Sequence, residues 1–307
     1  MTGAPKNPLQ RRRFSLNDPK VVPYVLVLPF VLYFLLVYLY PAISTVIMSF
    51  QKLEGPNHAT FIGTTNYERM WSSNFIKAIM TTLRYTFWDV LILVPVPLFF
   101  AVLLNSKIVK APSFFKSVFF IPALTSIIVA GIVFRLAFGT LETSIANRII
   151  GLFGAAPKKW LMEAGTGNFV LILLTLWRWL GVNIVYYYSG LQGIPKELYE
   201  AAQIDGASAW QQFVHVTIPA IKPVIIYVTT ITVMGGFSMY TESVALWEST
   251  NPGGVGRTIV GYMYMTGINK NNMGMASAVG LVLLGMVLIV NLLQLWLMGF
   301  FKKEDKA

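Results

Sequence analysis

Cysteine is absent from this sequence of 307 residues, and histidine is nearly so. Without cysteine the chain can form neither a disulfide framework nor a thiolate metal site. The two histidines, His58 and His215, fall in separate predicted loops, so neither a metal cluster nor a catalytic triad is expected. The phosphate loop G-x-x-x-x-G-K-[ST] is also missing, which excludes ATP hydrolysis of the usual kind. Because no nucleophile and base fall together, we do not expect an enzyme.

Charge is also scarce. Only 12% of the residues are charged while 55% are hydrophobic, and the mean hydropathy is +0.62. A soluble domain of this size would carry about twice that charged fraction. The formal net charge of +11 could suggest nucleic acid, but the basic residues cluster at the ends of apolar segments. That distribution indicates membrane topology, so we expect a lipid bilayer and no nucleic acid as the partner.

Long apolar runs are what the sequence does contain. Each run exceeds the roughly 20 residues that a helix needs to cross a bilayer. The predicted fold class is therefore an all-α membrane protein with about six transmembrane helices. The predicted spans are residues 21–50, 75–105, 117–138, 168–190, 223–247 and 273–301.

Basic residues at both ends of the chain indicate its orientation. The N-terminal arm, residues 1–20, carries five of them, and the tail, residues 302–307, carries three. Because basic residues favour the cytoplasmic side, we expect both termini in the cytoplasm and residues 21–301 as the transmembrane domain. The loop between the fourth and fifth spans then lies in the cytoplasm as well.

This loop, residues 191–222, is polar and rich in helix-forming residues. Pro195 and Glu197 suit the first turn of a helix, and Gly206 is placed to end it. Ser208 can cap a second short helix. One face of the first helix carries Leu198, Ala201, Ala202 and Asp205 at helical spacing. The side chains of the two alanines are small, so another backbone could come close to this face. A polar loop with no core of its own is expected to contact something in the water phase.

The same loop carries the strongest resemblance to a known family. Glu200-Ala201-Ala202, Gly206 and Val216-Thr217-Ile218-Pro219 have the residue types and spacing of the permease subunits of binding-protein-dependent ABC importers. Two residues depart from the family pattern: Val216 replaces an isoleucine and Ile218 replaces a leucine, and both changes conserve the shape of the side chain. In that family this segment is the coupling helix that docks on an ATPase subunit. The plainer alternatives are an amphipathic helix on the membrane surface or an ordinary connector. By resemblance, the coupling residues are Glu200, Ala201, Ala202, Asp205, Gly206 and Pro219.

The resemblance is nearest to the carbohydrate-uptake (maltose-type) branch, and it also implies partners. Two ATPase copies would bind ATP and magnesium, so this chain itself would need no cofactor and no metal. A second, different permease would complete the pathway, and an external binding protein would deliver a sugar or oligosaccharide. The implied location is the cytoplasmic (inner) membrane of a bacterium or archaeon.

Polar and aromatic residues inside the spans are the candidates for the substrate pathway, because charges at membrane depth usually face the interior or a water-filled cavity. For any single residue, structural pairing is an equally good explanation. A secondary transporter or channel that uses Asp89 and Glu242 for ion coupling remains the alternative function. A tyrosine run at 186–188 is interpreted as an aromatic belt at the inner membrane surface. The candidate pathway residues are Asp89, Trp177, Arg178, Asn183, Tyr240 and Glu242.

Overall fold

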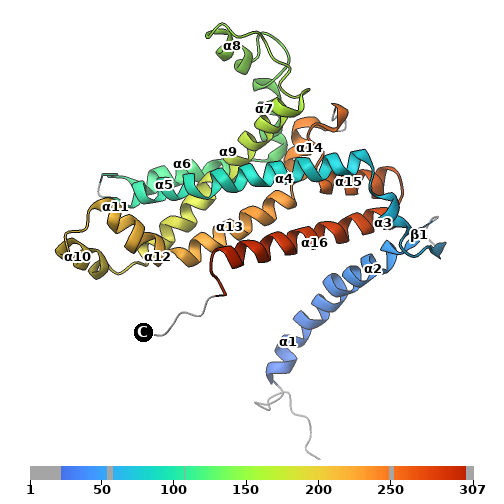
Figure 1. The fold of residues 1–307 in the computed structure, drawn as a ribbon, viewed down its shortest axis with the longest axis horizontal. Helices are drawn as coiled ribbons and strands as arrows, with labels where there is room; N and C mark the ends of the chain where they lie inside the picture. Colours follow the sequence, from blue (N-terminus) through green and yellow to red (C-terminus); the bar gives the residue numbers. More distant parts are fainter. Residues whose placement is uncertain (1–21, 54–57, 107, 249–251, 302–307) are drawn as a thin grey trace, which may run out of the picture.

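Long helices dominate the computed structural model, which describes residues 22–53, 58–106, 108–248 and 252–301 (Figure 1). The predicted arm and tail, residues 1–20 and 302–307, lie outside these described residues. Among the described residues, four helices are long and apolar enough to cross a membrane, and the number rises to as many as six if each of two bent pairs is one span. The predicted all-α membrane fold is confirmed.

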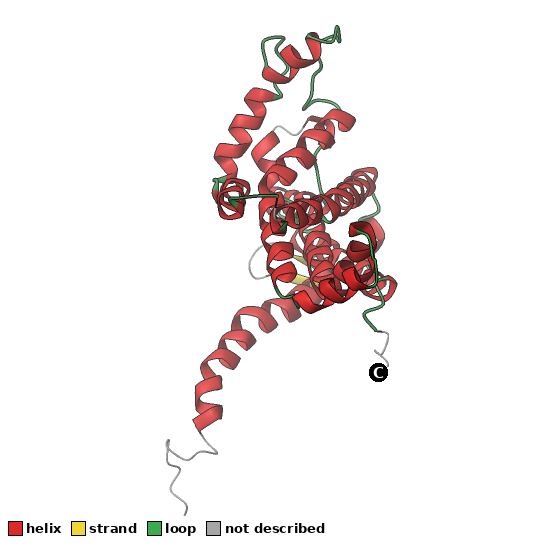
Figure 2. Ribbon diagram, turned by 90° about the vertical axis from the view of Figure 1, so that its left-hand side faces the viewer, coloured by secondary structure: helices red, strands yellow, loops and turns green. Residues whose placement is uncertain are grey.

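The first predicted span is one long helical rod. It consists of α1 (Val22–Tyr33), the π-helical η1 (Phe34–Leu39) and α2 (Tyr40–Ser49). The π-helix ends just before Pro41, whose missing N–H and bulky ring disturb the regular hydrogen-bond ladder. No residue of α1 is buried, and Figures 1 and 2 show this rod leaving the body of the molecule.

A small outer module follows the rod. Strands β1 (Gln51–Leu53) and β2 (Ala59–Phe61) form an antiparallel hairpin, and α3 (Thr65–Arg69) lies next to it. Asn66 is buried and donates hydrogen bonds to the carbonyls of Ser49 and Gln51, at 2.8 and 3.0 Å. These bonds satisfy the carbonyl groups left free where α2 ends.

The second predicted span is one continuous span whose helix is interrupted once. Helix α4 (Ser73–Leu93) stops at Val94, and α5 (Pro95–Asn105) begins directly after it. Two prolines, Pro95 and Pro97, explain the break, because neither can donate a backbone hydrogen bond.

Two predicted spans are not single straight helices. The third, 117–138, is divided into α6 (Pro112–Leu124) and α7 (Ile127–Ala137), which meet at 93° because Thr125 and Ser126 have extended backbone. The fifth, 223–247, is divided into α13 (Lys222–Phe237) and α14 (Thr241–Trp247). The predicted span bounds did not include these breaks. Hydropathy shows only how long an apolar run is. Both breaks lie inside apolar runs, so hydropathy could not reveal them.

Helix α9 (Ala164–Gln192) is the central helix of the bundle, packing against α4, α5, α6 and α13. Its approach to α6 depends on Gly181, because a Cβ at this position would overlap the carbonyl of Phe119. The remaining elements are α8 (Ile145–Gly151), η3 (Pro252–Gly254), α15 (Ile259–Tyr264), η4 (Met265–Asn269) and α16 (Met273–Leu297).

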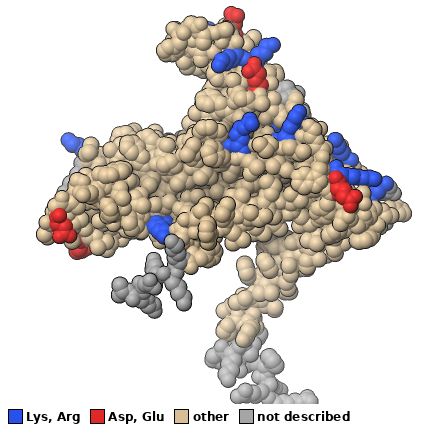
Figure 3. All heavy atoms as spheres, viewed as in Figure 1, with Lys and Arg blue, Asp and Glu red and all other residues tan. Residues whose placement is uncertain are grey.

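The surface agrees with residence in a bilayer. Charged side chains are sparse over the middle of the face in Figure 3 and gather toward its extremities. Many large apolar side chains are exposed on the rod and on α16, for example Phe30 at 71% and Leu297 at 68%. An aqueous surface would make such exposure unfavourable, whereas lipid or another apolar helix would not.

Candidate functional site

The loop 191–222 folds into short helices at one end of the molecule (Figure 1). Helix α10 (Lys196–Ile204) ends in two hydrogen bonds: Ala207 N donates to Ala202 O at 2.9 Å, and Gly206 N donates to Gln203 O at 3.0 Å. This pattern requires a left-handed residue after the helix, and Gly206 supplies it with φ of +76°. The predicted helix end at Gly206 is confirmed.

A second cap starts the next helix. Ser208 accepts a hydrogen bond from the N–H of Gln211, whose side chain accepts one from the N–H of Ser208 in return. This capping box fixes the start of α11 (Ala209–Gln212), as predicted for Ser208. Pro219 lies inside α12 (Ile218–Ala220), after the π-helical η2 (Phe213–Thr217). A bend of 69° then leads into α13.

A side-chain hydrogen bond also holds the first helix to the later part of the loop. The hydroxyls of Tyr199 and Thr217 lie 2.9 Å apart. The outward face of α10 is open: Glu200, Ala201 and Asp205 are exposed, and Ala202 is half-buried. Large apolar side chains are also uncovered, notably Ile204 at 86% and Trp210 at 71%. Exposed apolar groups on rigid, capped helices are typical of a surface that docks on a partner.

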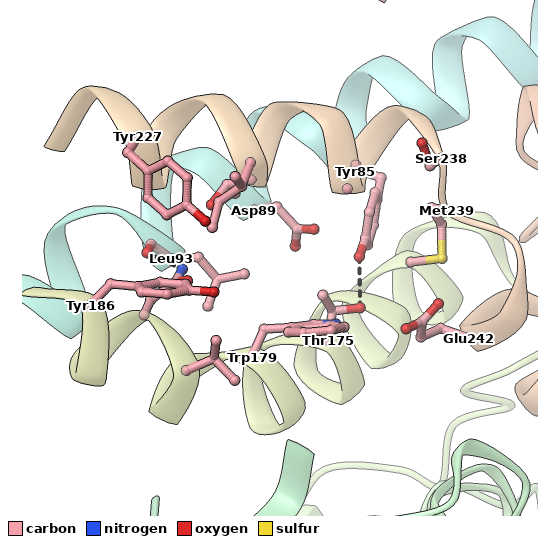
Figure 4. A pocket seen from close by; sticks show the side chains of 16 residues that line it. Tyr85, Asp89, Leu93, Thr175, Trp179, Tyr186, Tyr227, Ser238, Met239 and Glu242 are labelled. Carbon is pink, nitrogen blue, oxygen red and sulfur yellow. Dashed lines mark hydrogen bonds between the residues drawn. The ribbon is translucent and has the colours of Figure 1, made fainter. Parts of the chain in front are cut away.

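The second candidate site is a cavity of about 360 Å³ between α4, α9, α13 and the start of α14 (Figure 4). Figure 4 shows the rings of Trp179 and Tyr186 along one wall and Tyr227 facing them from another. The carboxyl groups of Asp89 and Glu242 approach the space from different helices. The cavity therefore combines flat aromatic surfaces with hydrogen-bonding groups.

Asp89 is the most deeply enclosed charged group of the cavity. It is 2% exposed, and its Oδ1 has no hydrogen-bond partner in the described chain. One helical turn away, the Tyr85 hydroxyl donates to Thr175 Oγ1 at 2.6 Å, which joins α4 to α9. A buried acceptor without a partner is costly, so Asp89 is poised to accept a hydrogen bond from a bound molecule.

Glu242 is held in place by an ion pair. Arg178 Nη1 lies 2.9 Å from Glu242 Oε1, and both side chains are largely buried. The guanidinium also lies 5.4 Å from the ring centre of Trp179. The second oxygen of Glu242 accepts a hydrogen bond from Thr241 Oγ1 at 2.8 Å. Arg178 does not line the cavity itself, but it fixes the carboxylate that does.

Asn183 lines the cavity and also completes the break between α4 and α5. Its Nδ2 donates to Leu93 O at 2.9 Å. In an unbroken helix that carbonyl would accept from the residue four positions later, which is Pro97 and has no N–H. Asn183 therefore supplies the donor that Pro97 lacks.

Two of the predicted pathway residues lie elsewhere. Trp177 is 39% exposed and packs against Phe134, with ring centres 5.8 Å apart. Tyr240 stacks on Tyr264 at 5.3 Å and lines a separate groove. The cavity thus gathers Asp89, Asn183 and Glu242, with Arg178 directly behind it.

Sequence reasoning missed several cavity residues. Tyr85 and Asp89 are one turn apart on α4, and Thr175, Trp179 and Tyr186 share a face of α9. Helical spacing from Asp89 was the signal that could have found Tyr85. The aromatic-belt interpretation of 186–188 was wrong, because Tyr186 lines the cavity and Tyr187 is fully buried. Within the described ranges, no three histidine or acidic side chains gather as a metal site would need.

Comparison with known proteins places this geometry in a family. A family described as "Binding-protein-dependent transport system inner membrane component" matches residues 71–304. The arabinooligosaccharides transport system permease protein AraP of Bacillus subtilis is 51% identical, over 93% of this chain and 91% of that protein. Its counterpart in Halalkalibacterium halodurans is 48% identical, over 94% and 92% of the two chains.

The fold has a solved counterpart as well. The crystal structure of a bacterial ABC transporter involved in alginate import contains a chain with a TM-score of 0.79 and 23% identity, covering 92% of this chain and 96% of that one. The predicted resemblance to the permease subunits of ABC importers is therefore confirmed, and with it the predicted role in transport. This chain belongs to the family of inner-membrane permeases of binding-protein-dependent ABC transporters.

Proposed function

We propose that this permease forms half of the pathway for a short arabinose-containing oligosaccharide. The observation that carries the proposal is the cavity in which Asp89 and Glu242 face the ring of Trp179. Sugar rings present C–H faces that stack on aromatic side chains, and hydroxyls that need acceptors. The two relatives that are 51% and 48% identical are named for arabinooligosaccharides, which favours this sugar class.

Within the proposal, Asp89 and Glu242 accept hydrogen bonds from sugar hydroxyls, and Asn183 keeps the cavity wall in shape. Arg178 holds Glu242 in position. Trp177 and Tyr240 lie outside this cavity, so they contact the sugar only where the pathway extends beyond it. A site of modest affinity suffices, because one that bound tightly in both states of the transporter would not release its substrate.

The loop 191–222 is the proposed contact with an ATPase partner, which binds ATP and magnesium. Glu200, Ala201, Ala202, Asp205 and Gly206 form the docking helix and its end, and Pro219 stiffens the return to the bundle. The loop joins α9 directly to α13, and these two helices form opposite walls of the cavity. Closure of the ATPases therefore rocks both walls and changes which side of the membrane the cavity faces.

The proposed assembly contains this chain, a second and different permease, two ATPase copies and an external binding protein. Both termini, residues 1–20 and 302–307, lie in the cytoplasm, and residues 21–301 form the transmembrane domain. The exposed apolar surface of the rod Val22–Ser49 is compatible with either lipid or the second permease.

Reconstitution tests the proposal. The chain, its second permease, the ATPase and the binding protein are placed in vesicles, and uptake of labelled arabinotriose is measured with and without ATP. We expect uptake that requires ATP and the binding protein, and that unlabelled arabinotriose inhibits more strongly than lactose. Uptake that continues without ATP, or that lactose inhibits equally well, would refute the proposed function or its sugar class respectively.

A further inference from the structure

A second hollow lies on another side of the contact between α4 and α9. It is a groove of about 420 Å³. Arg84, Trp88 and Ile92 form one wall at intervals of four residues on α4. The other wall descends along α9 from Gly165 and Asn168 to Leu176. Arg84 and Ile92 are eight positions apart, as are Asn168 and Leu176, which corresponds to a rise of about 12 Å along each helix.

Arg84 has no hydrogen bond or ion pair within the described chain, whereas the other arginines of the spans do. Arg135 pairs with Glu248, and Arg178 pairs with Glu242. Arg84 is exposed on the surface of α4, and an arginine at membrane depth without an anionic partner is unfavourable. The guanidinium therefore indicates an anion that this chain does not itself supply.

A second polar group of the groove also lacks a partner. Asn168 is 6% exposed, and its Oδ1 has no hydrogen-bond partner in the described chain. It sits in the second turn of α9, at the end of that helix far from the loop 191–222. A hydroxyl or ammonium donor entering the groove would satisfy this acceptor. Arg84 and Asn168 are thus the two polar side chains among the residues that line the groove.

The rest of the lining is apolar. Apart from Gly165 it consists of Trp88, Ile92, Phe169, Ile172, Leu173 and Leu176. The groove therefore combines two polar side chains with an apolar wall, and it runs along helices that cross the membrane.

We propose that this groove binds a phospholipid, with the head-group phosphate on Arg84, a head-group donor on Asn168 Oδ1 and an acyl chain along Ile172, Leu173 and Leu176. Anionic lipid with a hydroxylated head group, such as phosphatidylglycerol, fits both polar partners. The site lies in the outer leaflet, an assignment that rests on the proposed orientation of the loop 191–222 toward the cytoplasm. A soluble anion would leave the apolar part of the groove uncovered, and the bilayer supplies both chemistries at this depth.

Lipid retention measures the site directly. The full chain is purified together with its partner subunits from membranes that contain phosphatidylglycerol, and retained lipid per chain is determined by mass spectrometry. Arg84→Gln should lower retained phosphatidylglycerol by about fivefold, the effect of one basic residue at a lipid surface. Arg84→Lys keeps the charge and should retain most of it. Arg148→Gln, which removes an exposed arginine on α8, is the matched control and should change nothing.

The apolar half of the groove has its own test. Leu173→Trp fills the groove without changing charge and should also lower retention, whereas Leu293→Trp on the exposed face of α16 should not. This pair keeps the proposal testable if Arg84→Gln does not fold. Equal retention in Leu173→Trp and the natural chain would overturn the proposal, and so would equal retention in a folded Arg84→Gln.

Two further results would also overturn it. One is loss of the second permease from Arg84→Gln with phosphatidylglycerol unchanged, which would make a protein the partner of Arg84. The other is release of the lipid by inorganic phosphate alone. Uptake of arabinotriose is followed in parallel: failure of uptake in the natural chain counts against the proposed function, and unchanged lipid retention in both variants counts against this site.

Discussion

At the scale of single residues, the buried ion pair between Arg178 and Glu242 should be sensitive to substitution. Glu242→Gln leaves a buried guanidinium without its charge partner, which typically costs about 3–5 kcal/mol. Replacing both partners, with Arg178→Met and Glu242→Leu, removes the unpaired charge and should recover most of the stability. Thermal unfolding of the purified chain in detergent measures both effects. A double variant that is less stable than either single variant would contradict this account.

For Asp89→Asn we predict the opposite effect: transport decreases while the stability of the chain changes little. Its Oδ1 already lacks a partner in the described chain, and Asp89→Asn keeps the size and shape of the side chain, so we expect little change in stability. One carboxyl oxygen that could accept a hydrogen bond from a sugar hydroxyl is replaced by an amide N–H group, and the loss of one hydrogen bond predicts about a fivefold decrease in uptake. Uptake in vesicles and the unfolding temperature are measured together. Glu142→Gln, at an exposed acidic residue of the outer loop, should leave uptake and unfolding temperature unchanged.

At the scale of elements, the end of α10 depends on the left-handed conformation of Gly206. No atom lies within 4 Å of a Cβ built there, so only backbone strain opposes substitution. Gly206→Ala should cost about 1–2 kcal/mol of local stability and weaken association with the ATPase partner. Gly206→Asn should be milder, because asparagine tolerates this conformation. Co-purification of the ATPase reports the effect, with Gly151→Ala as a control whose glycine has neither positive φ nor close neighbours.

The contact between α6 and α9 predicts a much larger effect at Gly181. Here an added Cβ meets backbone, which cannot move aside as the end of a side chain can. Gly181→Ala should force the two helices apart and strongly reduce the amount of folded chain in the membrane. Gly285→Ala on α16, where nothing lies within 4 Å, should leave that amount unchanged. Equal accumulation of the two variants would show that α6 and α9 do not pack as described.

Local signals explain which elements the sequence could predict. Gly206 and Ser208 end and begin helices through bonds to residues within five positions, so their roles were readable from the chain alone. The 93° bend at Thr125 and Ser126 was not, because neither residue is a strong helix breaker. The cavity combines residues of four helices. Trp177 and Trp179 point in directions that differ by about 200° around α9, and the sequence did not show which of them faces the cavity. Only tertiary packing decides which face of α9 turns inward.

At the scale of the whole molecule, the two candidate sites belong to one mechanical path. Tyr186 lines the cavity near the end of α9, Tyr227 lines it near the start of α13, and the loop 191–222 joins those two helices. The two rings lie edge to face with centres 5.3 Å apart. If the loop moves α9 and α13 relative to one another, this contact must open and close once in each transport cycle.

Cross-linking can test that motion, because a chain without cysteine admits unambiguous thiol chemistry. The double variant Tyr186→Cys with Tyr227→Cys is joined by a cleavable bifunctional thiol reagent, which ties α9 to α13. We expect ATP-driven uptake to stop when the link forms and to return when it is cleaved. The pair Tyr186→Cys with Ser189→Cys places the same reagent within α9 alone and should leave uptake unaffected by cross-linking. Uptake that continues across the α9–α13 link would mean that these walls move as one body and that the cavity opens elsewhere.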